Sequence, residues 1–173
     1  MNSISSRLPT SIGSQSHLVT LDLSNNTVLG PLPTSIEHLS HLQTLNLLLN
    51  SISSQLPTSI RNLSHLQTLD LSYNSISDPL LTSLGKLSHL ETLHLPNNSI
   101  SGPLPTSIGN LSHLQTLYLS YNKISSPLPR WVGNLPNLES CLSNNLISSG
   151  YLSFACRPWT FPLTQSPVHF QHQ

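Results

Sequence analysis

A period of 24 residues runs through this sequence and restricts what the chain can fold into. Residues 17–40, 41–64, 65–88, 89–112 and 113–136 align beneath one another as five consecutive units without a gap. Residues 1–16 hold the last part of an earlier unit in the same frame. Because each unit of such an array contacts only its neighbours, the period predicts a solenoid that is stabilised by the stacking of its repeats.

The first half of each unit predicts a short strand. Leucine occupies its second, fifth and seventh places and asparagine its tenth, as in Leu66, Leu69, Leu71 and Asn74. The alternation about Asp70 points the leucines inward and the aspartate outward. Stacked units then pair their strands in parallel, about 4.8 Å apart. The asparagine side chain both donates and accepts, so we expect it to bond backbone groups in the turn. The fifth-place leucines are expected to form a buried column: Leu21, Leu45, Leu69, Leu93 and Leu117.

The second half of each unit closes the core from the other side. Its apolar positions are exemplified by Ile100, Leu104, Ile108 and Leu111. Proline recurs here, removes a backbone donor and fixes φ, which favours extended chain or short 3₁₀ turns. The sequence therefore predicts a solenoid with a parallel β-sheet on its concave face, extended and 3₁₀ segments on its convex side, and little α-helix.

These patterns together resemble a known family. The strand pattern matches the leucine-rich repeat consensus L-x-x-L-x-L-x-x-N, and residues 101–111, SGPLPTSIGNL, resemble the plant-type subclass of that family. The resemblance covers about residues 2–150. The subclass includes receptor-like kinases, receptor-like proteins and polygalacturonase inhibitors. Its ectodomains normally begin with a signal peptide and a cysteine-bearing cap, so the chain is expected to be a fragment of such an ectodomain.

Two departures from the repeat are visible. Leu81 replaces a proline, and Ser54, Asp78 and Ser126 replace the glycine found at Gly30 and Gly102, so we expect the second extended segment to be imperfect in alternate repeats. The frame also breaks in a degenerate sixth repeat, residues 137–150, where the leucine and asparagines after position 141 come one residue early. A one-residue loss in a strand reverses its alternation. Residues 151–173 lack the leucine frame and are expected to be an irregular or disordered tail.

The two cysteines, Cys141 and Cys156, are too few for a disulfide framework. Cys141 stands at a core leucine position beside Leu117, so a buried thiol is the default interpretation. The alternative is a bond between Cys141 and Cys156, which would resemble the terminal cysteine pairs of the family.

Composition narrows the classes of function. Only 7% of the residues are charged, and six basic side chains balance six acidic ones, so no positive field attracts nucleic acid or an anionic membrane. The first seven residues lack the apolar core of a secretory signal, and no apolar run approaches the roughly 20 residues of a membrane span. We therefore expect the chain as written to carry neither a secretory signal nor a membrane span. An extracellular or cell-surface location is implied by the family resemblance alone.

Histidine and serine recur in a pattern that invites chemical interpretations. A histidine follows a serine at one repeat position, at His17, His41, His65, His89 and His113. These side chains should stack in a straight ladder, which does not supply the tetrahedral convergence that zinc requires. Equivalent Ser-His pairs likewise argue against a single catalytic serine, and no HExxH or phosphate-binding loop is present. We therefore expect no metal, no cofactor and no enzymatic activity.

Four Asn-x-Ser/Thr triplets predict glycan acceptors if the chain is exported. They begin at Asn25, Asn62, Asn97 and Asn110. Chance is the alternative, because the chain is rich in asparagine and serine and the Asn-Leu-Ser triplet is part of the repeat.

Outward strand positions predict a recognition surface. One column is uniformly threonine, from Thr20 to Thr116, whereas the next varies: Asp22, Asn46, Asp70, His94 and Tyr118. Variation is what recognition requires, although an unconstrained column would drift in the same way. Tyrosine is enriched in interface hot spots. The predicted ligand-binding residues of the concave face are Asn46, Asp70, Tyr73, Glu91, His94, Tyr118 and Tyr121.

Three functions remain open from the sequence. The first is a non-enzymatic module resembling a plant receptor-like ectodomain, with a role in signalling or plant defence, that binds a protein or peptide ligand or a co-receptor. The second is an inhibitor of a secreted polysaccharide hydrolase, as the polygalacturonase inhibitors are. The third is a truncated or degenerate gene product without present function.

Overall fold

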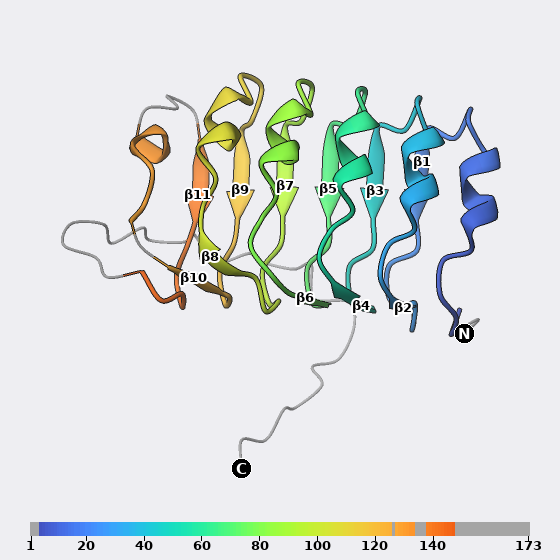
Figure 1. Ribbon diagram of the computed structural model, residues 1–173, viewed down its shortest axis with the longest axis horizontal. Coiled ribbons are helices and arrows are strands. Elements are labelled where there is room, and N and C mark those ends of the chain that lie inside the picture. The colour runs from blue at the N-terminus through green and yellow to red at the C-terminus, as the bar shows by residue number, and fades with distance from the viewer. Residues whose placement is uncertain (1–3, 126, 134–137, 148–173) are drawn as a thin grey trace, which may run out of the picture.

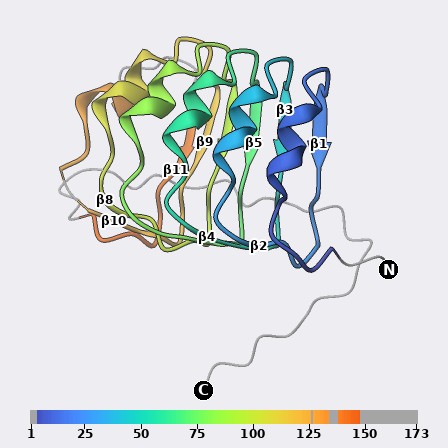
Figure 2. The same cartoon turned by 45° about the vertical axis from the view of Figure 1, so that its right-hand side comes forward.

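A parallel sheet forms one side of a solenoid in which each turn stacks on the next (Figure 1, Figure 2). The fold is taken from a computed structural model that describes residues 4–125, 127–133 and 138–147. The sheet has six strands in the order β1-β3-β5-β7-β9-β11. Their bounds are β1 Thr20–Asp22, β3 Thr44–Asn46, β5 Thr68–Asp70, β7 Thr92–His94, β9 Thr116–Tyr118 and β11 Glu139–Cys141.

The predicted leucine column is confirmed. The first five strands pair position for position, so Leu45 lies opposite both Leu21 and Leu69, and the register continues through Leu93 to Leu117. Leu21, in the first strand, is 9% exposed, whereas the other four are fully buried. The parallel pairing follows from repetition, because every turn presents the same residues at the same height.

Short 3₁₀ helices cover the opposite side, as predicted. They are η1 Thr10–Ser14, η2 Thr34–His38, η3 Thr58–Asn62, η4 Thr82–Lys86, η5 Thr106–Asn110 and η6 Arg130–Gly133. Proline at an extended φ and ψ precedes η1, η2, η3 and η5. Leu81 takes the same conformation before η4, with φ −74° and ψ 140°, so the loss of that proline leaves the turn intact. No α-helix occurs among the described residues.

A second row of short strands connects the sheet to the 3₁₀ helices. It consists of β2 Leu29–Gly30, β4 Ser51–Ser54 and β6 Ser75–Ile76 in one sheet, and of β8 Ser101–Pro103 and β10 Lys123–Ser125 in another. Between β6 and β8 the row is interrupted, and a single bridge from Pro79 to Ser101 crosses the gap. Asp78 stands at this interruption with φ +65°, where Gly102 of the next repeat has φ +73°. Left-handed backbone favours glycine, and the imperfection expected for this segment is found at Asp78. At Ser54 the expectation is wrong, because this residue has φ +69° and still belongs to β4, which pairs with both β2 and β6. Residue 126 lies outside the described residues.

An asparagine ladder ties each turn to the next, which confirms its predicted structural role. Asn74 Nδ2 donates to the carbonyl oxygens of Leu47 and Leu71, at 2.9 and 3.1 Å, and Asn74 Oδ1 accepts from the backbone N–H of Ile52 at 2.9 Å. One amide thus satisfies groups in two neighbouring turns. The ladder residues are Asn26, Asn50, Asn74, Asn98, Asn122 and Asn145.

The sixth repeat corrects the predicted frame. Ser140, and not Cys141, lies opposite Leu117, while Cys141 lies opposite Tyr118. The missing residue therefore falls before β11 and not after Cys141, and Asn145 resumes the ladder by donating to the carbonyl oxygen of Leu119 at 2.9 Å. The leucine column ends in a serine.

Cys141 is buried, as expected. The expectation that it is a free thiol is wrong, because Cys141 is disulfide-bonded. Its bonding partner lies outside the described residues. Cys156 and the predicted tail, residues 151–173, lie outside them as well, so the pairing of Cys141 with Cys156 stays a prediction.

The burial of the leucine column yields a test of the stacking energy. Leu69→Ala should lower the free energy of unfolding by about 2 to 5 kcal/mol, because Leu69 is fully buried between turns on both sides. Gln15→Leu should change the stability little or raise it, because Gln15 is exposed at the repeat position that Leu39 and Leu63 fill with buried side chains. Urea unfolding followed by circular dichroism measures both, and a loss below about 1 kcal/mol for Leu69→Ala would contradict the assignment of the core.

Candidate functional site

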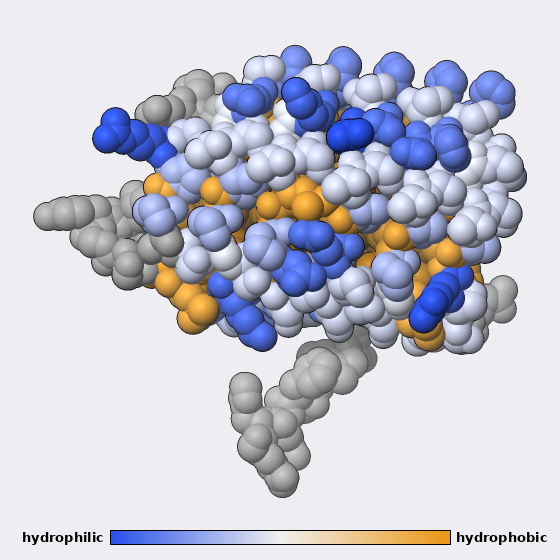
Figure 3. Space-filling model, in the orientation of Figure 1, coloured by the Kyte–Doolittle hydropathy of each residue, from blue (hydrophilic) through white to orange (hydrophobic). Residues whose placement is uncertain are grey.

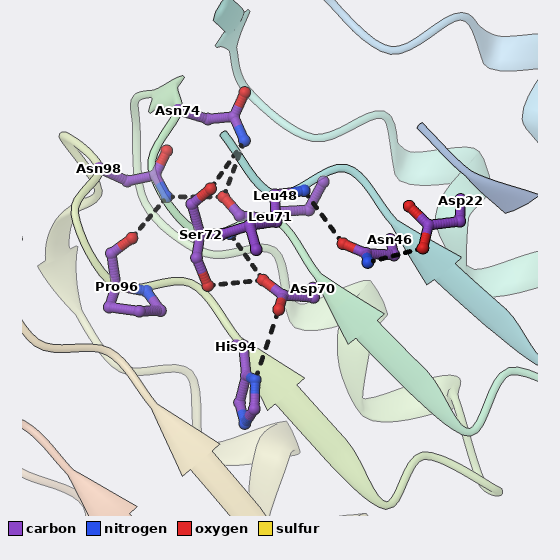
Figure 4. Close-up of polar contacts among 10 residues, drawn as sticks. All are labelled: Asp22, Asn46, Leu48, Asp70, Leu71, Ser72, Asn74, His94, Pro96 and Asn98. Atoms are coloured by element: carbon purple, nitrogen blue, oxygen red, sulfur yellow. Dashed lines mark hydrogen bonds and ion pairs between the residues drawn. The ribbon is translucent and has the colours of Figure 1, made fainter. Parts of the chain in front are cut away.

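The variable column runs along the outward face of the six-stranded sheet, which we call the sheet face. Pairing places Asp22 beside Asn46, Asp70 beside His94, and His94 beside Tyr118. Asn46 Nδ2 donates to Asp22 Oδ2 at 3.2 Å (Figure 4). The rings of His94 and Tyr118 are stacked, with centroids 4.7 Å apart and planes within 4°. Neighbouring turns thus hold one another's side chains in defined orientations.

Asp70 supports this column more than it offers itself to a ligand. Its carboxylate accepts hydrogen bonds from the backbone N–H and the hydroxyl of Ser72, and Oδ2 lies 3.6 Å from His94 Nδ1 (Figure 4). Burial opposes its ionisation, but the bonds from His94 and Ser72 outweigh burial and hold the pKa of Asp70 below its usual value. The predicted exposure of Asp70 is wrong, because the residue is only 9% exposed. Its charge orients the His94 ring.

Tyr118 links the stacked pair to a residue that the sequence reasoning missed. Partial burial, and after it the neighbouring carboxylate of Glu139, raise the pKa of Tyr118 to about 12. The phenol therefore keeps its proton at neutral pH and donates toward Glu139. Glu139 was overlooked because the frame was counted from Leu138. Counted back from Asn145, the frame places Glu139 opposite Thr116, in an outward column.

Tyr73 and Tyr121 lie in turns and not on strands, which corrects their predicted placement. Each follows its strand by three residues and has φ near +55°, a left-handed conformation that is uncommon for large side chains. Leu49 occupies the same position one turn before Tyr73, with φ +55°. All three are exposed, at 44% for Leu49, 43% for Tyr73 and 57% for Tyr121. Together with Asn97 they form a row, here called the turn row, beside the sheet face. Asn97 separates the two tyrosines, so their rings are not neighbours.

Glu91 lies at the other end of the strands, directly before β7. Its side chain is half-buried, and its carbonyl oxygen accepts the N–H groups of Gln115 and Thr116, at 2.8 and 3.0 Å. The structure therefore brings Asp70, His94 and Tyr118 together at the centre of the sheet face. It places Glu91 and the turn row at opposite margins.

The histidine ladder has the predicted straight form. Successive rings from His41 to His113 are 6.0 to 6.1 Å apart and nearly parallel. Two nitrogens that bind one zinc ion, each at about 2.0 to 2.1 Å, lie no more than about 4.2 Å apart, and rings held in this way do not converge to that extent. Among the described residues, no group of three histidine, cysteine or acidic side chains could hold a metal ion.

In the recurrent Ser-His pairs, the histidine nitrogen nearest the serine hydroxyl carries a hydrogen and so cannot act as a base toward it. His65 Nδ1 lies 3.3 Å from the hydroxyl of Ser64, but it also lies 2.8 Å from the carbonyl oxygen of Ser40. Because a carbonyl oxygen only accepts, Nδ1 carries the hydrogen and cannot take a proton from the serine.

The four predicted glycan acceptors differ in their accessibility. Asn25, Asn62 and Asn110 are exposed, whereas Asn97 is half-buried in the turn row. Asn62 Nδ2 donates to Glu37 Oε2 at 2.9 Å. Within the described part of the chain, no helix is long and apolar enough to cross a membrane.

Comparisons with known proteins agree with this architecture. Residues 16–76 and 88–147 match the sequence model of a family described as leucine rich repeat. The plant peptide hormone receptor RGFR1, solved in complex with RGF2, is 30% identical over 85% of this chain and 24% of its own, with a TM-score of 0.82. The ectodomain of the membrane receptor kinase GASSHO1/SCHENGEN3 from Arabidopsis thaliana is 38% identical over 85% of this chain and 18% of its own, with a TM-score of 0.82.

A plant ice-binding protein is 27% identical over 83% of this chain and 46% of its own, with a TM-score of 0.78. No curated protein sequence matches the chain significantly. The chain spans about a quarter or less of the length of RGFR1 and of the GASSHO1/SCHENGEN3 ectodomain.

The environment of Asp70 predicts a pH dependence of stability. Because its pKa is lowered in the folded state, Asp70 contributes fully above its unfolded-state value of about 3.9, and this contribution is lost as the pH falls through the lower folded-state value. Asp70→Asn should therefore be less stable than the parent near pH 7, with the difference shrinking below about pH 4. Urea unfolding across this range measures it. Asp78→Asn, at an exposed site, is the control, and an equal pH slope in both variants would contradict the role of Asp70.

Proposed function

The chain belongs to the leucine-rich repeat family, and we propose that it is a non-enzymatic recognition module. It binds a protein or peptide through its sheet face. The stacked pair of His94 and Tyr118, held by Asp70 from one side and Glu139 from the other, carries this proposal. Side chains that are already oriented lose little conformational freedom on binding. A ligand would therefore meet a prepared surface at the centre of the sheet.

The charge of the sheet face favours a ligand with a basic group. Asp22, Asp70 and Glu139 lie on its strands and Glu91 lies directly before β7, whereas none of the six strands contains lysine or arginine. Complementary charge speeds association and fixes the orientation of a ligand. A basic side chain or a free amino terminus is the group that fits this surface.

The turn row favours apolar contacts beside the acidic centre. Leu49, Tyr73 and Tyr121 are exposed in the turns that follow their strands. Tyrosine is also common among the residues that dominate binding energy. The proposed ligand is thus an extended segment that places a basic group near the exposed Glu139 and apolar side chains over the turn row.

The similar structures support the class of partner. RGFR1 was solved with RGF2, and the GASSHO1/SCHENGEN3 ectodomain with CASPARIAN STRIP INTEGRITY FACTOR 2. By the same analogy we propose that the chain acts outside the cell or at its surface, in signalling or defence. An exported chain would accept glycans at the exposed Asn25, Asn62 and Asn110.

Panning a displayed library of random peptides on the purified chain tests this proposal. Enriched peptides should carry basic and apolar residues, and Tyr73→Ala and Tyr121→Ala should each weaken the binding of a selected peptide by about 1 to 2 kcal/mol, or roughly 5- to 30-fold. Thr58→Ala, on the 3₁₀ side, is the matched control and should leave the affinity unchanged. Peptides without basic residues, or binding that tolerates both tyrosine substitutions, would place recognition elsewhere.

A second candidate function is adsorption to ice, which the regularity of the 3₁₀ side favours. A threonine begins each of the first five 3₁₀ helices, and all five are exposed: Thr10, Thr34, Thr58, Thr82 and Thr106. The hydroxyls recur once per turn along this side of the solenoid. The same helices also carry Glu37, Arg61 and Lys86, which stand at other positions of the repeat than the threonines, whereas Arg130 begins η6 at the threonine position. One similar structure is a plant ice-binding protein. We therefore include an ordered water lattice among the proposed ligands.

Inhibition of ice recrystallisation distinguishes this second function. The parent chain should slow crystal growth, and Thr58→Lys should abolish the effect by placing a bulky, strongly hydrated cation in the middle of the hydroxyl column. Tyr73→Lys, which introduces the same charge on the turn row, should retain it. Crystal growth at the rate of a matched inert protein would remove this candidate and leave peptide recognition untouched.

A further inference from the structure

The histidine ladder, defined as His17, His41, His65, His89 and His113, is a separate surface that neither proposed function uses. It lies in the connections between the 3₁₀ helices and the strands of the six-stranded sheet. Figure 3 shows a row of strongly hydrophilic residues along the edge where these connections run. All five histidines are exposed, and His17 continues the column with its ring 5.6 Å from that of His41.

Hydrogen bonding fixes the same tautomer along the ladder. The Nδ1 atoms of His41, His65, His89 and His113 lie 2.8 to 3.0 Å from a serine carbonyl oxygen of the preceding turn. Each Nδ1 therefore carries a hydrogen, and Nε2 of the neutral ring holds the lone pair. Nε2 is also the atom that gains the second proton. The ladder thus aligns one proton-accepting nitrogen per turn, on rings whose centroids are 6.0 to 6.1 Å apart.

Protonation determines the charge of this strip. Its flanking charged side chains are Glu37 and His38 of η2, Arg61 of η3, Lys86 of η4, and Glu91 before β7. The two permanent cations and the two carboxylates cancel, and Glu37 is already engaged by Asn62 at 2.9 Å and by His38 at 4.0 Å. Imidazole gains charge as the pH falls from about 8 to about 5. A protonated rung carries N–H groups on both ring nitrogens, and the rungs lie in line along the solenoid.

We propose that the protonated ladder binds a linear carboxylated polysaccharide along the axis of the solenoid. Such a chain presents carboxylates at regular intervals, and each protonated Nε2 offers a charge-assisted hydrogen bond. Sugar hydroxyls find partners in the exposed polar side chains on either side of the ladder. These are Ser40, Ser64, Ser88 and Ser112 on one side and Gln43, Gln67 and Gln115 on the other.

Ring stacking favours a polysaccharide over a single-stranded nucleic acid. Single-stranded nucleic acids bind through bases that stack on the open faces of aromatic side chains. From His41 to His113 the imidazole faces point at one another, which leaves the ring edges for a ligand. The N–H groups at the imidazole edges bind anions and hydroxyls. A carboxylated sugar chain supplies both groups and needs no nucleobase to stack on the rings.

Fluorescence anisotropy with a fluorescein-labelled linear polymannuronate tests the proposal on the full chain. With EDTA present to exclude bridging metals, the chain should bind at about pH 5.5 and at least about tenfold more weakly at about pH 7.5, where the imidazoles are neutral but the uronate remains charged. Substitution of His41, His65, His89 and His113 by asparagine keeps an amide donor for each serine carbonyl and removes the titrating nitrogen. This variant should lose the binding at the lower pH.

His38→Asn is the matched control, because it removes an exposed histidine outside the ladder and should leave binding intact. If the fourfold variant unfolds by circular dichroism, His65→Asn alone should weaken binding measurably, since His65 is the central rung. Equal binding at both pH values, or undiminished binding by a folded fourfold variant, would overturn the proposal. Equal binding of neutral dextran or of an oligothymidylate with the same number of charges would overturn the assigned ligand class.

Discussion

The asparagine ladder is the interaction on which the rest of this structure depends. A chain that turns away from a strand at every repeat leaves backbone donors and acceptors without partners, and each buried unpaired group costs about 1 to 3 kcal/mol. One amide per turn, as at Asn74, satisfies groups in its own repeat and in the one before. The ladder also fixes the turn that precedes it. The residue before each asparagine, such as Leu49 or Tyr73, is held in left-handed backbone and directed outward. The exposed turn row is thus a consequence of how the backbone is satisfied.

Exact repetition turns single residues into surfaces. Because each turn copies the one before, an outward side chain becomes a column with a fixed spacing, and the chemistry of the column is that of its residue type. Threonine gives hydroxyl rows, histidine gives aligned ring edges, and the one variable column gives the Asp70, His94 and Tyr118 cluster. The solenoid therefore presents several faces with distinct chemistry, and binding on one does not require the core to change.

Much of this architecture could be predicted from the sequence, since the leucine column, the asparagine ladder and the stacked histidines all follow from the period. What could not be predicted depends on contacts between particular side chains. Nothing in the repeat pattern shows that Ser72 and His94 would enclose the Asp70 carboxylate, so its burial was missed. The position of the one-residue deletion was ambiguous in the leucines, because Leu138 and Leu142 fit different frames. The hydrogen bond from Asn145 to Leu119 resolves the ambiguity, and with it the placement of Glu139 and Cys141.

The interrupted second row of strands affects how the solenoid responds to force. The six-stranded sheet is continuous, whereas the second row of strands breaks between β6 and β8. There the two turns are joined by the bridge from Pro79 to Ser101 and by the hydrogen bond that the Ser99 N–H donates to the Ile76 carbonyl oxygen at 2.8 Å. A layered beam bends most easily where one layer has the fewest bonds, so we expect the bending stiffness of this molecule to be lowest there. The repeats on either side of this break are those that carry Asp70 and His94. We therefore expect the most compliant cross-section of the solenoid to lie beneath the centre of the sheet face, between the strands that carry Asp70 and His94.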